Sequence, residues 1–286
     1  MLVMALSADP ERIKRHLTEV SIPRDIFSDP QNLLKVQKYI EDRFTSFGFL
    51  VEKQSFELRG ETFTNLIARA RDFDTNDRFI IAAHFDAVPE TPGADDNASG
   101  VAALLESARL LAASKAVRHI EFIAFNAEEY GMIGSSFYAK ALKQNQIKIS
   151  GMVSLEMVGF ASDRPGSQGL PGFLKPFYPD TGNFIGLVGN TGSNHLIRKA
   201  KDAFNKVRDL PVQTITLPMN GWFLPAARLS DHSPFWDAGF PALLITDTSF
   251  FRNPHYHTPD DCVDTLNLEC LTHVTDAVIQ LGLLFA

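Results

Sequence analysis

Four short clusters of acidic and imidazole side chains lie between residues 84 and 257 of this chain. They are His84-Phe85-Asp86, Asp95-Asp96-Asn97, Glu128-Glu129 with Glu156 beyond, and His255-Tyr256-His257. Each cluster falls where an apolar run ends, so the edge of one sheet could bring all four together. Carboxylates and imidazoles without thiolates form sites suited to zinc, manganese or cobalt. The pattern therefore predicts metal-assisted hydrolysis.

Most of these clusters also have an ordinary explanation when taken alone. His84 and Asp86 could be a strand-end histidine bonded to a turn, and Asp95-Asp96 could cap the next helix. Glu128-Glu129 could be a solvated acidic turn. Glu156 is harder to explain, because its neighbours are apolar and a buried, unpaired carboxylate is costly. A metal ligand is the favoured interpretation of Glu156.

The histidines are expected to play different parts. A loop rarely presents both side chains of a His-x-His pair to one ion, so we expect His257 to be a ligand and His255 not to be. His232 is expected to order a loop near the site. Asp86 follows His84 by two residues and could accept the ring N–H of its imidazole. That bond would leave the other ring nitrogen free for a metal.

The elements that would position these clusters alternate between strand and helix. Strands are predicted at 49–58, 62–70, 78–83, 118–125, 149–155, 183–188, 212–217 and 242–246, and helices at 98–113, 134–146, 193–207 and 266–285. Two further helices are expected near the N-terminus, with Ser7 and Ser28 as N-caps. The alternation predicts an α/β fold: a mostly parallel mixed central sheet with helices on both faces.

A single domain over residues 1–286 is favoured, because no linker or repeat divides the chain. Residues 1–27 would form an N-terminal helical extension. The stretch 160–182 is rich in Pro, Gly and aromatic residues without periodicity, and such long irregular segments are often functional. We expect it to form the rim of the site together with 218–230.

Composition limits the classes of partner. The net charge of -7 argues against nucleic acid, whose phosphates need clustered Lys and Arg. No apolar run is expected to reach the length of a membrane span, and the N-terminal residues do not resemble a signal peptide, so a cytoplasmic location is expected. Cys262 and Cys270 are expected to be reduced, buried thiols. Oligomeric state is left open.

Taken in order, the motifs resemble those of the M28 zinc metallopeptidases. The resemblance covers about residues 30 to 285 and implies a zinc-dependent exopeptidase-like fold, two zinc ions per chain and a peptide substrate. It implies that Asp96 bridges the ions, with the remaining ligands divided as His84 and Glu156 at one ion and Glu129 and His257 at the other. A hydroxide between the metals would attack the peptide, with Glu128 as general base. Tyr256 would stabilise the oxyanion, and Asp86 would support His84.

The resemblance leaves alternatives. Many relatives carry Asp where this chain has Glu156, whose longer side chain could tighten the space for a substrate amino group. Glutaminyl cyclases resemble the same fold but generally use one zinc and have Trp at the position of Tyr256, which favours a peptidase here. Some relatives are non-catalytic binding proteins, against which the complete ligand set and Glu128 argue. A serine hydrolase is disfavoured because no GxSxG motif is present.

The substrate preference is predicted from aromatic residues in the two irregular segments. Phe173, Phe177 and Tyr178, with Trp222 and Phe223, could rim an apolar pocket that prefers an apolar N-terminal residue. Alternatively, these side chains could pack their loops onto the domain or form a subunit contact.

Overall fold

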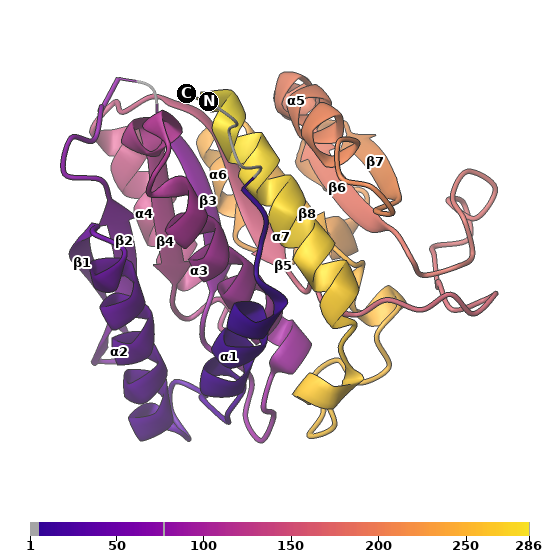
Figure 1. Cartoon of the computed structure of the whole chain (residues 1–286), viewed down its shortest axis with the longest axis horizontal. Helices are drawn as coiled ribbons and strands as arrows, with labels where there is room; N and C mark the ends of the chain where they lie inside the picture. Colours follow the sequence, from indigo (N-terminus) through magenta and orange to yellow (C-terminus); the bar gives the residue numbers. More distant parts are fainter. Residues whose placement is uncertain (1–5, 77, 286) are drawn as a thin grey trace.

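An eight-stranded mixed sheet runs through the centre of the computed structural model, which describes residues 6–76 and 78–285 (Figure 1). The spatial order of the strands is β1-β2-β4-β3-β5-β8-β6-β7. Their bounds are β1 Leu50–Leu58, β2 Glu61–Arg69, β3 Arg78–His84, β4 Ile120–Phe125, β5 Ile149–Glu156, β6 Ile185–Asn190, β7 Val212–Leu217 and β8 Ala242–Thr246. The predicted mixed sheet is confirmed.

The middle of the sheet is parallel, which decides where the functional side chains meet. β3 pairs in parallel with β4 and β5, and β5 pairs in parallel with β8. β2 runs antiparallel to β4, and β6 runs antiparallel to β8. The carboxyl ends of β3, β4, β5 and β8 therefore share one edge, where ligand sites of open α/β sheets form.

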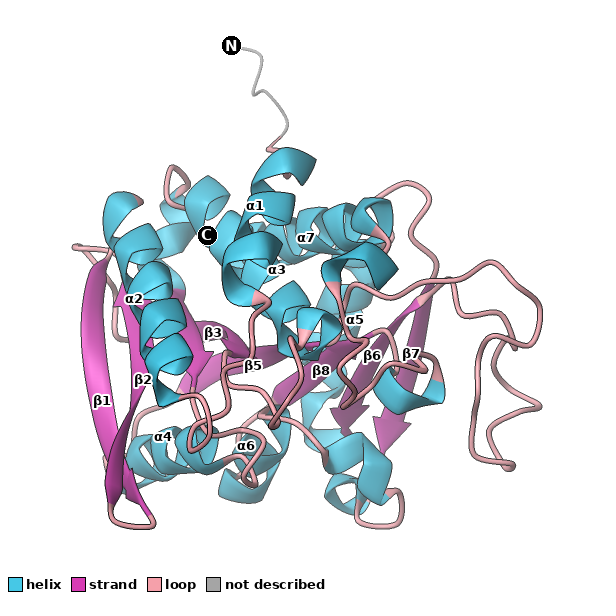
Figure 2. Cartoon of the chain, turned by 90° about the horizontal axis from the view of Figure 1, so that it is seen from below, coloured by secondary structure: helices cyan, strands magenta, loops and turns pink. Residues whose placement is uncertain are grey.

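Helices cover both faces of the sheet (Figure 2). One face carries α1 (Pro10–Val20), α2 (Pro30–Ser46), α3 (Gly100–Leu111), α5 (Asn194–Phe204) and α7 (Leu268–Gly282). The other carries α4 (Ile133–Gln144) and α6 (His232–Ala238). Two apolar cores result, because side chains of successive strand residues point to opposite faces. On β3, Phe79 and Ile81 enter the larger core while Ile80 enters the smaller one.

The first two helices begin later than the serine caps predicted. Asp9 is the N-cap of α1, and its carboxylate accepts a hydrogen bond from Glu11 N at 3.0 Å. Asp29 is the N-cap of α2. Ser7 and Ser28 are therefore not the caps: a proline occupies the first position of each helix, where its missing N–H costs nothing, and the aspartate just before it takes the cap position.

The irregular segments and one short helix depart most from simple periodicity. Residues 160–182 contain no helix or strand in the described structure, as expected for a rim segment. The helix α6 was not predicted, because its 7 residues are too few to show a helical repeat.

Cys262 and Cys270 are free but only half-buried, so the expectation of burial is wrong.

The C-terminal helical segment is a longer apolar run than the sequence led us to expect. Residues Leu268–Phe285 have a mean hydropathy of 1.3 over 18 residues, which by length and composition alone meets the criterion for a membrane span. The expectation that no run reaches that length was therefore wrong. In the fold, α7 packs against α1, α3 and α5, and 56% of the segment is buried. These contacts are those of a core helix.

Candidate metal centre

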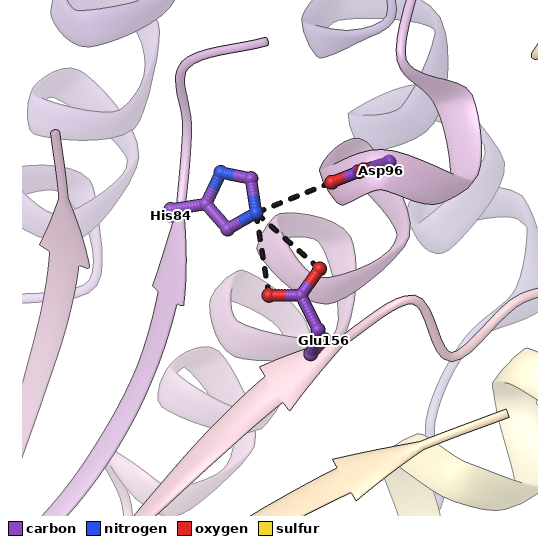
Figure 3. Close-up of side chains that lie close together, drawn as sticks. All are labelled: His84, Asp96 and Glu156. Atoms are coloured by element: carbon purple, nitrogen blue, oxygen red, sulfur yellow. Dashed lines mark hydrogen bonds and ion pairs between the residues drawn. The ribbon is translucent and has the colours of Figure 1, made fainter. Parts of the chain in front are cut away.

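Three acidic and imidazole side chains, which form the first donor group, converge where β3 and β5 end (Figure 3). His84 is the last residue of β3 and Glu156 the last of β5, while Asp96 comes from the loop before α3. His84 Nε2 lies 3.3 Å from Asp96 Oδ1 and 3.3 Å from Glu156 Oε2. All three residues are buried. One ring nitrogen and two carboxylates thus face a common point.

A second group shares Asp96 with the first. His257 Nε2 lies 3.1 Å from Asp96 Oδ2 and 3.2 Å from Glu129 Oε2. The two oxygens of Asp96 therefore face different histidines, Oδ1 toward His84 and Oδ2 toward His257. All five residues predicted as ligands are brought together, in two sets of three with Asp96 common to both.

The chemistry of the donor atoms fits divalent cations. Within each group, the ligand atoms lie within 4.8 Å of one another. Asp96 Oδ1 and Glu129 Oε1 are buried and accept no hydrogen bond from the described residues. Buried carboxylates without hydrogen bonds are costly unless a cation compensates them. Imidazole and carboxylate donors are those that zinc takes in hydrolytic sites.

The pKa values of these groups report how strongly negative the centre is in the absence of metal. Burial raises the pKa of Glu129 to about 7, and the charge of Asp96 adds to that rise. Burial lowers the pKa of His257, but hydrogen bonds to Asp96 and Glu129 outweigh it and raise the value to about 10. Burial also lowers the pKa of His84, and the charges of Glu156 and Glu128 raise it well above 6.5. The negative charge of the carboxylates therefore keeps both imidazoles protonated.

Glu128 lies beside the two groups but belongs to neither. Its Oε2 is 4.0 Å from His84 Nε2, and its side chain is 11% exposed. Burial raises its pKa well above the ordinary value, and the charges of Glu156, Asp231 and Glu129 add to the rise while His84 opposes it. A carboxylate with a raised pKa, next to a candidate metal centre and lining a pocket, is suited to accept a proton.

Asp86 holds the two glutamates as well as facing His84. Its Oδ1 accepts a hydrogen bond from Glu128 N and its Oδ2 from Glu129 N, both at 3.1 Å. Oδ1 also lies 3.6 Å from His84 Nδ1, beyond an ordinary hydrogen bond. Asp86 therefore connects the end of β3 to the turn after β4, a second contact that the His-x-Asp spacing alone did not predict.

Tyr256 lies flat against the second group. Its ring stacks on His257 with centroids 3.7 Å apart and an interplanar angle of 18°. Burial raises the pKa of its hydroxyl, and the charges of Asp96 and Glu129 add to the rise. The hydroxyl therefore keeps its proton at neutral pH. It lines the same pocket as the glutamates and is available as a hydrogen-bond donor.

His255 and His232, the other histidines near the clusters, lie outside both donor groups. His255 contacts Phe160, with ring centroids 6.4 Å apart. His232 Nε2 lies 2.9 Å from Ala227 O and so ties down the preceding loop. Its pKa falls to about 3, chiefly through burial. The structure thus separates both from the donor set, as predicted, and gives His232 its expected ordering contact.

Several supporting residues escaped prediction because their hydrogen-bond partners are distant in sequence. Asp261 accepts hydrogen bonds from Asp95 N at 2.9 Å and Asp96 N at 3.1 Å. Ser230 donates to Glu156 Oε2 at 2.8 Å. Asn97 donates to Leu155 O at 2.8 Å. Of these residues, only Asn97 belonged to a cluster that stood out in the sequence, because it follows Asp95-Asp96.

A largely apolar pocket opens directly from the donor cluster. Its volume is about 130 Å³, and Asp96, Glu128, Glu129 and Glu156 form one wall. The remaining lining comes from several segments, among them Leu170, Leu174, Tyr178, Ile215, Leu224, Leu229, Leu244, Phe250 and Phe251. Both predicted rim segments, 160–182 and 218–230, contribute to it.

The aromatic residues predicted to form this pocket mostly do not. Tyr178 lines it, and its hydroxyl donates to Thr214 O at 3.0 Å. Phe173, Phe177, Trp222 and Phe223 are exposed and are not among its lining residues. Shorter aliphatic side chains of the same loops face inward instead. The apolar character was predicted from the wrong members of each loop.

The sequence model of Peptidase family M28 matches residues 65–282, which include all five candidate ligands. This chain belongs to peptidase family M28. As a member of a peptidase family, it is expected to act on peptides.

Curated relatives place this M28 chain near both uncharacterised and characterised proteins. It is 36% identical to the uncharacterized protein YfbL of Escherichia coli, over 96% of this chain and 88% of the relative. It is 30% identical to the aminopeptidase YwaD of Bacillus subtilis, over 80% of this chain and 47% of the relative. The M28 chain thus spans about half the length of that aminopeptidase.

Solved structures share the fold. The LapA aminopeptidase of Legionella pneumophila superposes with a TM-score of 0.76 at 21% identity, over 96% of this chain and 71% of LapA. BSAP, a zinc aminopeptidase from Bacillus subtilis, gives 0.59 at 28% identity, over 78% and 50%. A glutaminyl cyclase of Porphyromonas gingivalis gives 0.71 at 21% identity, over 96% and 98%. Peptidases and a cyclase therefore share this architecture, and fold likeness alone does not choose between them.

Proposed function

We propose that this M28 chain is a co-catalytic di-zinc aminopeptidase that removes N-terminal residues from peptides. The observation that carries the proposal is the sharing of Asp96, whose two carboxylate oxygens face His84 and His257 separately. The kinship to the zinc aminopeptidase of Bacillus subtilis supports the metal and the reaction. His84 and Glu156 would hold one ion, Glu129 and His257 the other, and Asp96 both.

Two zinc ions bound there would polarise a carbonyl and lower the pKa of water from ~15.7 to about 7. Glu128 is the residue that would take up the proton and later return it to the leaving amine. Its pKa is raised by burial, which brings proton uptake and release closer to neutral pH. Its main-chain N–H is held by Asp86, so its position relative to Glu129 is constrained.

Tyr256 would donate its hydroxyl proton in a hydrogen bond to the oxygen on which negative charge develops. Stacking on His257 holds the ring in place before a substrate arrives, and a pre-oriented donor is what such stabilisation needs. Its raised pKa keeps the hydroxyl in the donor form.

Exopeptidase action would follow from the acidic wall of the pocket. A free α-amino group carries a positive charge, and Glu156 lies at the pocket wall among other carboxylates. The rest of the lining is mostly aliphatic and aromatic, which supports a preference for an apolar N-terminal side chain. Glu156, longer than the aspartate of many relatives, is also held by Ser230, so it does not swing freely into this space.

Metal content, aminopeptidase activity and a Glu128→Gln variant together test the proposal. The purified protein should bind two zinc ions and release p-nitroaniline from Leu-p-nitroanilide. Glu128→Gln should keep both ions but lower kcat by about 10²–10⁴-fold, the usual contribution of a general base. One ion per chain with cyclisation of N-terminal Gln would contradict the proposal in favour of a cyclase. Two bound ions with no hydrolysis of any aminoacyl p-nitroanilide would favour a binding protein.

A further inference from the structure

The connection between α1 and α2 places two charged residues, Arg24 and Asp25, against the loops of the metal centre. Arg24 is fully buried and Asp25 is 1% exposed. Both precede residue 65, where the family match begins, so they lie outside the part of the chain that the M28 pattern describes. Burial of two charged side chains is costly unless their contacts compensate it.

Arg24 grips the main chain of the loop between β3 and α3. Its Nε donates to Phe85 O at 2.8 Å and its Nη2 to Gly93 O at 2.9 Å. Its Nη1 donates to Pro92 O, and Asp96 O lies 3.5 Å from Nη2. Within the described residues, its hydrogen bonds all go to carbonyl oxygens. The planar guanidinium thus holds the two ends of one loop, the end after His84 and the end before Asp96.

Burying this cation among neutral acceptors is costly, and the surrounding charge explains how it is tolerated. Burial lowers the pKa of Arg24 to about 10, while the carboxylates of Asp96, Asp86, Asp261 and Glu129 oppose that fall. The side chain therefore remains charged at neutral pH. Lysine could not reproduce the arrangement, because a single ammonium cannot present a fork of donors to separate carbonyls.

Gly93 shows that the backbone is built around this guanidinium. It has a φ of 56°, and a Cβ there would lie 2.2 Å from Asp96 O, 3.0 Å from Arg24 Nη2 and 3.1 Å from Arg24 Nη1. A side chain at this position would displace either the guanidinium or the loop that carries Asp96. Glycine is thus required for the close approach of Arg24 to the loop.

Asp25, the next residue, holds the other loop. Its Oδ2 accepts a hydrogen bond from the hydroxyl of Tyr130 at 2.6 Å, and Tyr130 directly follows Glu128-Glu129. Its Oδ1 accepts from Ser28 N at 2.7 Å, which fixes the carboxylate itself. The ring of Tyr130 packs edge-on against Phe27 with centroids 5.1 Å apart.

We propose that Arg24 and Asp25 are positioning residues that set the spacing between the two metal-binding groups. Arg24 holds the loop that follows His84 and supplies Asp96, and Asp25 holds the turn that supplies Glu129. Because the two residues are adjacent, one short segment couples both loops. The proposal rests on the di-zinc function proposed above, and it assigns the N-terminal segment a part in the metal centre.

The test compares cobalt binding and kinetics in Arg24→Met, Arg24→Lys and Tyr130→Phe. Loss of a residue that orients metal ligands typically lowers metal affinity by about 10–100-fold. We expect a loss in this range for Arg24→Met, a smaller loss for Arg24→Lys and a loss of up to about tenfold for Tyr130→Phe. The visible absorption spectrum of the cobalt-loaded protein should shift in each case, and kcat should fall more than KM rises.

Matched controls separate positioning from a general loss of stability. Arg69→Lys weakens a half-buried ion pair with Glu121, near the other end of β4. Tyr39→Phe removes a hydroxyl that lies 2.7 Å from His16 Nδ1. Both controls should lower the melting temperature without changing the cobalt spectrum or affinity. If Arg24→Met does not fold, the two milder variants carry the same comparison.

Unchanged cobalt affinity and spectrum in Arg24→Lys and Tyr130→Phe, with only stability reduced, would overturn the positioning role. That result differs from a failure of the proposed function. A wild-type protein that binds two cobalt ions but hydrolyses no aminoacyl substrate would reject the aminopeptidase and leave the positioning role to be decided by the spectra. A wild-type protein that binds fewer than two ions would reject both.

Discussion

At the scale of single residues, the centre depends on carboxylates whose oxygens face more than one partner. Asp96 divides its two oxygens between His84 and His257, while its N–H is bound by Asp261. The two oxygens of Asp86 accept hydrogen bonds from the N–H groups of Glu128 and Glu129. Each carboxylate is held by at least one hydrogen bond or ion pair before any cation binds, which lowers the cost of arranging the donors on binding.

Replacing Asp86 should weaken metal binding without removing a ligand. Asp86→Ala leaves Glu128 N and Glu129 N without their acceptor and takes away the carboxylate that faces His84. We expect zinc affinity to fall by about 10–100-fold. Equilibrium dialysis against a zinc chelator measures this, with Asp202→Ala, a change at an exposed residue of α5, as the control. Equal affinity in the two variants would contradict the role of Asp86.

Metal binding should release protons at neutral pH. In the metal-free protein the pKa of His257 is raised to about 10, so its imidazole carries a proton at pH 7, and a cation must displace it. Apparent zinc affinity should therefore fall as the pH falls. Titration calorimetry in two buffers of different ionisation enthalpy gives the number of protons released. Zero release at pH 7 would show that the histidines are neutral before binding.

At the scale of elements, the termini of strands and helices decide which side chains reach the centre. β3 ends at His84 and β5 at Glu156, and Asn97 joins the start of α3 to β5 through Leu155 O. Gly100 makes this junction possible, since a Cβ there would lie 2.3 Å from Asn97 Oδ1 and 2.6 Å from Leu155 O. The Asp96 loop is thus held against β5 as well as against Arg24.

The contact between α1 and α2 should make stability depend on pH. His16 of α1 is buried, its Nδ1 lies 2.7 Å from the hydroxyl of Tyr39 of α2, and burial lowers its pKa to about 4. The unfolded chain, with an ordinary pKa near 6.5, binds this proton more readily, so stability is lost as pH falls from about 6.5 to about 4. The shift corresponds to roughly 3 kcal/mol at most.

His16→Gln should remove this part of the pH dependence. Urea unfolding of the wild type and the variant at pH 7 and pH 4.5 measures the difference. The wild type should lose more stability than His16→Gln on acidification, although the variant is less stable at pH 7. The same pH dependence in both proteins would exclude His16 as its source.

At the scale of the whole molecule, the pocket is assembled from segments that are far apart in the chain. Leu174 comes from the irregular stretch after β5, Ile215 from β7, and Leu229 from the loop before α6. These segments meet beside the donor cluster because β8, β6 and β7 follow β5 in that order across the sheet. The proposed substrate preference therefore depends on several strands of the sheet and on both rim loops.

A charge placed in this pocket should alter substrate choice more than catalysis. Ile215→Arg puts a cation in an apolar wall, and we expect kcat/KM for Leu-p-nitroanilide to fall by about 10–200-fold, the range for a mismatched apolar pocket. Ala-p-nitroanilide should lose less, because its side chain is short. Zinc content serves as the control and should not change. Equal losses for both substrates would show that Ile215 does not contact the substrate side chain.

Removing metal should destabilise the entire fold. The centre gathers buried carboxylates whose mutual repulsion the imidazole protons only partly relieve. A cation present at 100 times its dissociation constant stabilises the folded state by about 2.7 kcal/mol. Thermal melts with zinc and after chelation should therefore differ by several degrees, with recovery on adding zinc back. Identical melts would mean that no cation binds the folded protein.

The sequence alone predicted the strands, the longer helices and the types of donor, but not the short helix α6. Local periodicity predicted β7 and β8 at their observed bounds, because that pattern depends only on neighbouring residues. Donor residues at strand ends predicted a metal centre at one sheet edge, and the structure brings all five of them together. Short-range chemistry carries this information.

Only the tertiary structure decided which strands pair, which residues support the donor side chains and which side chains line the pocket. The order β4-β3-β5-β8 departs from chain order, so only the folded sheet gives the observed distances from His84 to Asp96 and Glu156. Arg24 left no periodic or motif signal, because its acceptors in the loop before α3 are main-chain carbonyls more than 60 residues away. The inward residues of the rim loops were equally hidden, since an irregular backbone has no repeat from which side-chain direction can be inferred.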